Sequence, residues 1–367
     1  MASKRTYWAI TALGIGPEGT PDGTGLKTAT YLKGVQSVGI STNFNLEQVF
    51  QLGQLEIYQD VEEVPDIEIS IEKVLDDNPT AYQKAIGQST VVSGVATTDQ
   101  SSGGSVLKLT EIQNNKCDAY LTVHPDSAEN AGDSGDNGDV ESFVWCSGMY
   151  VSSVSFNFPT DGNFTESVTL VGNHKQWYAG GASYTLAGAP VTGGLHTGDI
   201  MRRQNFEFDT IPASISPGGT AGFGDKGHPV VSNVTVSTDF GREAINALGS
   251  KLPYHRYVTF AVEVTCEIEV VINDAKAQDI DALPLTDSNL SEESIKIKIW
   301  DEPIADAPGG GDHTGLQAQG SNIIHQIDLG TKNKITSITY GGGDTGGGNA
   351  TYSYSYRNFN KLDYKYT

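Results

Sequence analysis

The sequence predicts a mainly β protein with two tandem antiparallel β-sandwich or barrel domains, each carrying a short flanking α-helix. The first observation is an internal repeat: residues 38–53 match residues 234–249 with seven identities in sixteen positions, where composition alone gives roughly one. The second is composition, because 43 glycines, 37% hydrophobic and 19% charged residues are typical of short strands and turns. The third is that several segments alternate polar and apolar residues with the period of a strand.

The repeat divides the chain into parts of domain size. We expect an N-terminal arm and a first β domain over residues 1–178, a linker or arm over 179–229, and a second β domain over 230–367. Further matches follow in the same order, namely 67–72 with 262–267, 107–109 with 295–297, and 150–156 with 334–340. A repeat of this length is a domain duplication rather than a solenoid.

Strands are predicted where the alternation is clearest. Residues 66–72 and 262–270 each place apolar side chains on one face and carboxylates on the other. A hairpin with an Asp-Gly turn is expected over 155–171, and a glycine-rich counterpart over 339–356 would place Tyr352, Tyr354 and Tyr356 on one face. The linker contains one expected strand, over 203–209.

Helices and loops complete the plan. Short helical segments ended by glycine are expected at 46–52 and 242–248, and helices at 79–86 and 274–283 would begin after the candidate N-caps Asn78 and Asn273. Residues 1–34 are expected to form a flexible arm. The stretches 97–104 and 114–140 are interpreted as insertions or loop tips.

Charge and composition exclude several classes of protein. The formal net charge is −22, and such a surface repels nucleic acid. No apolar run is long enough for a membrane helix, and the N-terminus has no apolar segment typical of a signal peptide. The three cysteines fit a reducing compartment; Cys266 is expected to be a buried free thiol, and a Cys117–Cys146 disulfide remains the alternative for the other two.

No motif predicts catalysis. Residues 14–19 match the dinucleotide fingerprint formally, but Pro17 prevents the helix that must receive the phosphates. The acidic loop 133–141 resembles a calcium loop without its last acidic ligand, and a solvated tip is the preferred interpretation. The histidines lack zinc spacing, and no nucleophile elbow occurs. We therefore predict a structural protein that is not an enzyme, with no catalytic, cofactor or metal residues.

The segments 35–75, 150–172, 236–243 and 256–270 resemble those of bacteriophage tail tube proteins. The resemblance implies tube-type β domains that assemble as stacked rings, line the channel for DNA ejection, and meet sheath, tape measure, terminator and baseplate proteins. It also implies assembly in the host bacterial cytoplasm and a place in the virion tail. Most members build a ring from six single-domain subunits. Two units per chain therefore predict a trimeric, pseudo-hexameric ring, with six chains as the alternative.

The resemblance gives the acidic strands a role. A tube that conducts DNA without binding it needs a lumen that repels phosphates. We therefore expect five carboxylates to face the channel, namely Glu68, Glu72, Glu263, Glu267 and Glu269. Two alternatives remain open. One is another β-rich virion component, such as a sheath, decoration or adhesin module. The other is a carbohydrate-binding or carbohydrate-active protein, because the two catalytic carboxylates of a glycosidase need only converge in space and leave no sequence motif.

Overall fold

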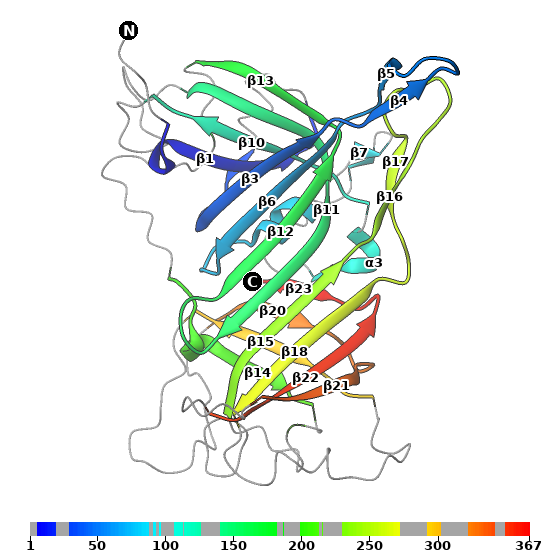
Figure 1. The fold of residues 1–367 in the computed structure, drawn as a ribbon. Helices are drawn as coiled ribbons and strands as arrows, with labels where there is room; N and C mark the ends of the chain where they lie inside the picture. The colour runs from blue at the N-terminus through cyan, green and yellow to red at the C-terminus, as the bar shows by residue number, and fades with distance from the viewer. Residues whose placement is uncertain are drawn as a thin grey trace, which may run out of the picture.

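The computed structural model shows a mainly β chain whose antiparallel sheets are all open (Figure 1). The β-rich class is therefore confirmed, and the described part of the chain closes no barrel by itself. The structure describes residues 6–19, 29–87, 91–92, 95–96, 106–112, 114–125, 140–181, 186, 199–212, 215, 230–271, 292–301, 322–341 and 349–367.

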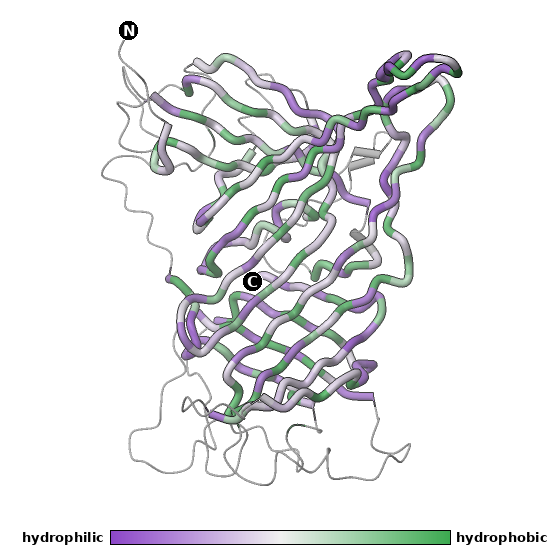
Figure 2. The backbone as a smooth tube through the Cα atoms, in the orientation of Figure 1, coloured by the Kyte–Doolittle hydropathy of each residue, from purple (hydrophilic) through white to green (hydrophobic). Residues whose placement is uncertain are grey.

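The largest sheet contains a continuous row of antiparallel strands, which we call the long sheet. Its strands lie in the order β3 (Val35–Asn43), β6 (Asp66–Val74), β12 (Thr165–Gly172), β11 (Val140–Pro159), β15 (Val230–Asp239), β18 (Glu263–Val271), β22 (Thr351–Phe359) and β21 (Lys334–Gly341). Burial alternates along most of these strands, and Figure 2 shows the matching alternation of hydropathy. One face of the long sheet is thus apolar and packs on the core, while the other is polar.

A second layer covers the apolar face. In one part β2 (Thr30–Tyr31), β1 (Thr11–Pro17), β10 (Cys117–Val123) and β13 (His174–Gly181) are joined to the first half of β11. In the other, a five-stranded sheet has the order β14 (Phe206–Thr210), β19 (Lys296–Trp300), β20 (Ile323–Asp328), β23 (Asp363–Tyr366) and β9 (Val106–Lys108). A single hydrophobic cluster joins both parts to the long sheet.

Short elements complete the described chain. The helical ones are η1 (Trp8–Ile10), α2 (Ala81–Ile86), α3 (Leu109–Ile112) and η2 (Arg203–Asn205). Three small two-stranded sheets are formed by β4 (Leu46–Phe50) with β5 (Ile57–Glu62), β7 (Val91–Val92) with β8 (Val95–Ala96), and β16 (Arg242–Ile245) with β17 (His255–Val258). Among the described residues, none of the helices is both long and apolar enough to cross a membrane.

The strand pairings of the first half of the chain recur in the second half. The pairs β3·β6, β6·β12 and β11·β12 correspond in register to β15·β18, β18·β22 and β21·β22. Even the irregularities coincide, since register shifts occur at Val151/Ser153 and at Ile335/Ser337. In the second layer, β1, β10, β11 and β13 pair in the same order as β14, β19, β20 and β23.

The registers correct two sequence matches. Residues 67–72 correspond to 264–269 rather than to 262–267, because Ser41 lies opposite Glu68 whereas its repeat partner Ser237 lies opposite Thr265. Residues 107–109 were aligned with 295–297, but β9 contains Leu107 and pairs with β23, whereas β19 contains Ile297 and pairs with β14 and β20. The strand that takes the position of β19 in the first half is β10. The second match was wrong because alternating apolar triplets are too common to define a register.

The short helices expected at 46–52 and 242–248 are wrong. Both segments form β-hairpins, β4 with β5 and β16 with β17. Gly53 and Gly249 do adopt left-handed φ angles, 88° and 86°, but they lie in the turns of the hairpins rather than at helix ends. A segment this short makes few helical hydrogen bonds, so pairing with a second strand decides its conformation.

Three segments expected to be irregular contain sheet strands. Residues 1–34, the expected flexible arm, include the buried strand β1 and the short strand β2. The expected insertion 114–140 contains β10, whose residues are nearly all buried. The linker 179–229 begins inside β13 and contributes β14, which begins at Phe206 after a 3-10 turn rather than at residue 203. Of these strands, β1 and β10 lack alternation because they are covered on both faces.

Other expectations are settled or lie outside the described residues. The hairpins over 155–171 and 339–356 are confirmed, and Tyr352, Tyr354 and Tyr356 are buried on one face. The helix at 79–86 is confirmed as α2, but its N-cap is Thr80, whose Oγ1 accepts a hydrogen bond from the Gln83 N–H at 3.1 Å; Asn78 is not the cap. The helix 274–283 with Asn273, the stretch 97–104, and residues 133–139 of the acidic loop fall outside the described residues.

All three cysteines are free and buried, so the alternative of a Cys117–Cys146 disulfide is wrong for this structure. Burial raises the pKa of Cys146 and of Cys266 to about 12. The thiols therefore stay protonated and behave as small apolar side chains.

Candidate assembly surfaces

The polar face of the long sheet holds all five carboxylates that sequence analysis selected. Glu68 and Glu72 lie on β6, and Glu263, Glu267 and Glu269 lie on β18; four are exposed and Glu269 is half-buried. The structure thus brings them to one face of one sheet, in two groups separated by β12, β11 and β15.

Small hydroxyl side chains occupy the space between the two acidic groups. Ser155 lies opposite Ser167 on one side and Ser237 on the other, and a shallow hollow of about 450 Å³ opens at this point. Neighbouring polar side chains on this face are hydrogen-bonded to one another. The Ser237 and Thr265 side-chain oxygens are 2.8 Å apart, and Thr235 Oγ1 donates to Asn157 Oδ1 at 3.0 Å. The face is therefore smooth, polar and acidic rather than shaped around a ligand.

The two halves of the chain meet in the middle of the long sheet, where β11 pairs with β15. The register places Ser155 opposite Ser237, with Val154 opposite Thr238 and Phe156 opposite Val236. Phe156 and Val236 are fully buried on the apolar side. This junction therefore combines backbone hydrogen bonds with a continuous core.

In the part of the chain that the structure describes, the two outer strands of the long sheet have free edges. Within the described residues β3 pairs only with β6, and β21 pairs only with β22. A free edge offers unpaired backbone groups to another strand, and long free edges in soluble proteins mark sites of association. The chain thus presents one such edge at each end of the same sheet.

The β16–β17 hairpin lies against the first half of the chain. Arg242 Nε donates to the Val151 carbonyl at 2.5 Å and its guanidinium lies 4.8 Å from the Tyr150 ring centre. The Tyr150 hydroxyl is 3.0 Å from His255 Nδ1. Arg256 forms an ion pair with Asp66. Partial burial raises the pKa of Asp66, but hydrogen bonds from Asn45 and Arg256 outweigh this effect and hold the pKa below its usual range.

The β4–β5 hairpin, by contrast, extends from a corner of the molecule beyond β3 (Figure 1). Its strands are exposed almost throughout. Large apolar side chains on it reach solvent, namely Leu46, Phe50, Leu52, Leu55, Ile57 and Tyr58. Exposed apolar surface of this extent marks an interaction site.

A buried polar cluster lies between the layers and was missed by sequence analysis. Lys73 Nζ pairs with Asp76 at 2.6 Å, and Glu166 lies opposite Lys73 on the neighbouring strand. Glu166 accepts hydrogen bonds from the Ala81 and Tyr82 N–H groups at 2.7 and 2.8 Å. Burial raises the pKa of Glu166 to about 7. A shifted carboxyl often marks a catalytic site, but this one holds the first turn of α2 in place.

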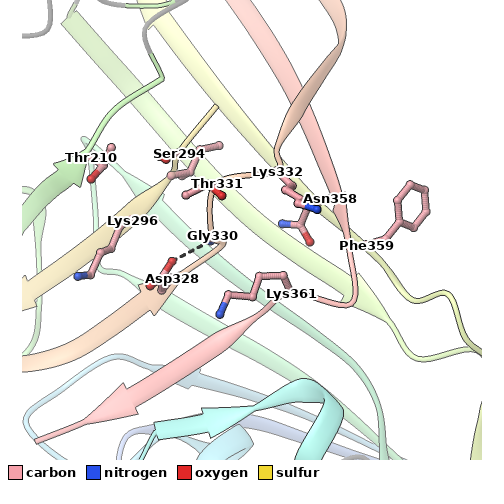
Figure 3. Close-up of a pocket in the computed structure, with 11 residues that line it drawn as sticks. Thr210, Ser294, Lys296, Asp328, Gly330, Thr331, Lys332, Asn358, Phe359 and Lys361 are labelled. Carbon is pink, nitrogen blue, oxygen red and sulfur yellow. Dashed lines mark hydrogen bonds between the residues drawn. The ribbon is translucent and has the colours of Figure 1, made fainter. Parts of the chain in front are cut away.

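A second polar feature is a lysine-rich pocket beside the turn after β20 (Figure 3). Lys296 pairs with Asp209 at 3.0 Å, and Lys361 pairs with Asp363 at 2.5 Å. Asp328, also in the lining, accepts a hydrogen bond from the Gly330 N–H at 2.7 Å. Most of the positive charge is therefore balanced within the chain, so the pocket is a weak candidate for an anion site.

Other observations bear on the class of protein. In the described part of the chain no group of three or more His, Cys, Asp or Glu side chains is arranged to hold a metal ion. No protein-family model matches the sequence, and no curated protein matches it. The surfaces described above are therefore the basis for a functional proposal.

Proposed function

We propose that the chain contains two copies of one tube-type β domain and assembles edge to edge into rings that stack as a bacteriophage tail tube. The observation that carries this proposal is the β11·β15 junction. It joins β11, the last strand of the first half in sheet order, to β15, the first strand of the second half. The strands that correspond to them, β21 and β3, lie at the two ends of the sheet and have free edges. One contact already made inside the chain would be repeated between chains.

The matched registers specify the contact. Ser155 of β11 corresponds to Thr339 of β21, because both lie opposite the matched serines Ser167 and Ser353. Ser237 of β15 corresponds to Ser41 of β3 through the internal repeat. Since Ser155 lies opposite Ser237, Thr339 of one chain is expected opposite Ser41 of the next, in an antiparallel pair.

A head-to-tail contact of this kind closes into a ring when its rotation divides a full turn. The resemblance to tail tube proteins favours six domain-sized units, and hence three chains. The rings would then form in the host cytoplasm and remain in the virion tail.

The orientation of the sheet in the ring follows from its layers. The apolar face carries the second layer, which needs more room and suits the outside of a closed ring. The polar face then lines the channel, and Glu68, Glu72, Glu263, Glu267 and Glu269 repel DNA phosphates so that DNA passes without binding. Exposed leucines at the hairpin tips, Leu52, Leu55 and Leu248, are surfaces that contact between stacked rings would cover.

A pair of cysteines tests the edge pairing. Opposed residues in an antiparallel pair have Cα atoms about 4.5–5.5 Å apart, which suits a disulfide. We expect the Ser41→Cys/Thr339→Cys variant to form disulfides between chains on mild oxidation, with a closed three-chain product on non-reducing gels. The three native cysteines are buried and should not compete.

Two controls use the same chemistry. Ser155→Cys/Ser237→Cys should form a disulfide within one chain, and Ser41→Cys/Ser337→Cys, which is out of register, should cross-link poorly. Chains that stay monomeric with the in-register pair would contradict the proposed contact. A closed six-chain product would contradict the trimer while leaving the edge pairing intact.

A further inference from the structure

We propose that the β4–β5 hairpin of one chain binds a basic groove on β21 and β22 of the neighbouring chain in the same ring. The inference rests on the proposed edge pairing and adds a second contact to it. The groove, of about 640 Å³, is lined by Glu292, Lys332, Lys334, Ile335, Thr336, Arg357 and Phe359.

The chain itself contains the equivalent contact. The β16–β17 hairpin follows β15, which pairs with β11, and it lies on Tyr150 and Val151 of that strand. In the matched registers Tyr150 and Val151 correspond to Lys334 and Ile335 of β21, two residues that line the groove. The position on β11 is thus occupied by the β16–β17 hairpin, whereas the described residues leave the equivalent position on β21 open.

The β4–β5 hairpin has the geometry to fill the open position. It follows β3 as β16–β17 follows β15, and if β3 pairs with β21 of the neighbour, the hairpin is directed over that groove. The hairpins correspond strand by strand, because Val49 lies opposite Gln59 as Ile245 lies opposite His255. Their turns also agree, with the Gln54 N–H donating to the Gln51 carbonyl and the Ser250 N–H to the Ala247 carbonyl, both at 3.2 Å.

Charge identifies which hairpin belongs to which position. Residues 44–63 of the first hairpin contain five acidic and no basic side chains, whereas the groove offers Lys332, Lys334 and Arg357. The second hairpin is basic instead, with Arg242, Lys251 and Arg256, and it lies near Asp66 and Glu18. Opposite polarities at equivalent positions keep each hairpin on its own groove.

Within the described residues, the groove is exposed, and three of its four charged lining residues are cationic. Lys334, Arg357 and Phe359 are exposed, and within the described residues no carboxylate forms an ion pair with Lys332, Lys334 or Arg357. Phe359 and Ile335 add apolar surface, which suits the exposed Leu46, Phe50 and Ile57 of the hairpin. The β4–β5 hairpin of a second copy, which is acidic and exposes apolar side chains, therefore matches the groove in charge and in apolar surface.

A photo-reactive residue tests the contact directly. We expect benzoylphenylalanine in place of Gln59 in the assembled protein to cross-link to the segment 332–336 of a neighbouring chain. The same substitution at His255 should cross-link within one chain, near Tyr150. Cross-links from position 59 to another segment, such as a hairpin of a stacked ring, would overturn the inference.

The cysteine pair at positions 41 and 339 separates the two proposals. If its disulfide forms but position 59 gives no cross-link to 332–336, the groove contact is wrong and the edge pairing stands. If the disulfide also fails, both are wrong.

Charge reversal gives a second test. Lys334→Glu/Arg357→Glu should raise the protein concentration required for assembly by about tenfold, because like charges then face each other. Glu47→Lys/Asp60→Lys on the hairpin should have the same effect, and the combined variant should assemble nearly as the wild type does. Arg203→Glu, at an exposed position elsewhere, is the control. Failure of the combined variant to recover, or an equal effect of the control, would overturn the inference.

Discussion

At the scale of single residues, two buried groups of opposite behaviour lie in the polar cluster between the layers. Burial raises the pKa of Glu166 to about 7 and lowers that of His325 to about 4. His325 lies between the Tyr364 hydroxyl, at 2.6 Å, and the Asp76 carbonyl oxygen, at 2.7 Å. Both groups are therefore neutral in the folded chain over much of the weakly acidic range.

These shifts predict opposite effects of pH on stability. Folding favours the protonated form of Glu166, so its contribution is fully present below pH 4.5 and is lost as the pH rises through 7. Folding favours neutral His325, so its contribution is fully present above pH 6.5 and is lost as the pH falls through 4. In the wild type the two trends partly cancel.

Removing one group should reveal the other. Between about pH 4.5 and 6.5, the unfolding free energy of Glu166→Gln should rise with pH, and that of His325→Gln should fall, each by roughly 3 kcal/mol. Urea unfolding at a series of pH values measures both. If the unfolding free energies of the two variants changed with pH in the same direction, Glu166 and His325 would not be the source of the pH dependence.

At the scale of elements, the N-terminal strand β1 belongs to the core although it was expected in a flexible arm. Leu13 and Ile15 are buried, and β1 pairs with β10 along its whole length. Gly16 approaches Ala29 so closely that an added Cβ would lie 2.9 Å from the Ala29 Cα. Gly16, one of the glycines of the formal dinucleotide pattern, thus serves close packing.

Substitution of Gly16 tests this role. Gly16→Ala should lower the unfolding free energy by roughly 1–3 kcal/mol, because the methyl group forces backbone atoms apart. Gly19→Ala is the matched control, since the nearest atom to its added Cβ is 3.8 Å away. Equal stabilities of the two variants in chemical denaturation would show that β1 does not pack as described.

At the scale of the whole molecule, one long sheet presents one polar face, and the proposed channel depends on its charge. Reversing Glu68, Glu72 and Glu267 to lysine should give tubes that retain duplex DNA at low salt and release it as salt rises, with a slope of about 0.9 per phosphate contacted. Co-sedimentation of labelled DNA with assembled tubes measures this. Asp161→Lys, at the exposed turn between β11 and β12, should not retain DNA, and equal retention by both would rule out a channel on this face.

The sequence by itself determined the β class, the recurrence of strand patterns, the common face of the three tyrosines of β22 and the glutamate-bearing face of each of β6 and β18. These follow from period two, which is a local property of an alternating strand. It did not reveal β1 or β10, whose strands are covered on both sides and do not alternate, nor the inward-facing Lys73 and Glu166.

Tertiary structure alone decided the features on which the proposed assembly depends. Segments 46–52 and 242–248 are too short to choose between helix and strand without a pairing partner. The β11·β15 junction and the basic groove bring together residues that are far apart in the chain. Which strands keep free edges likewise depends on the pairing of the whole sheet.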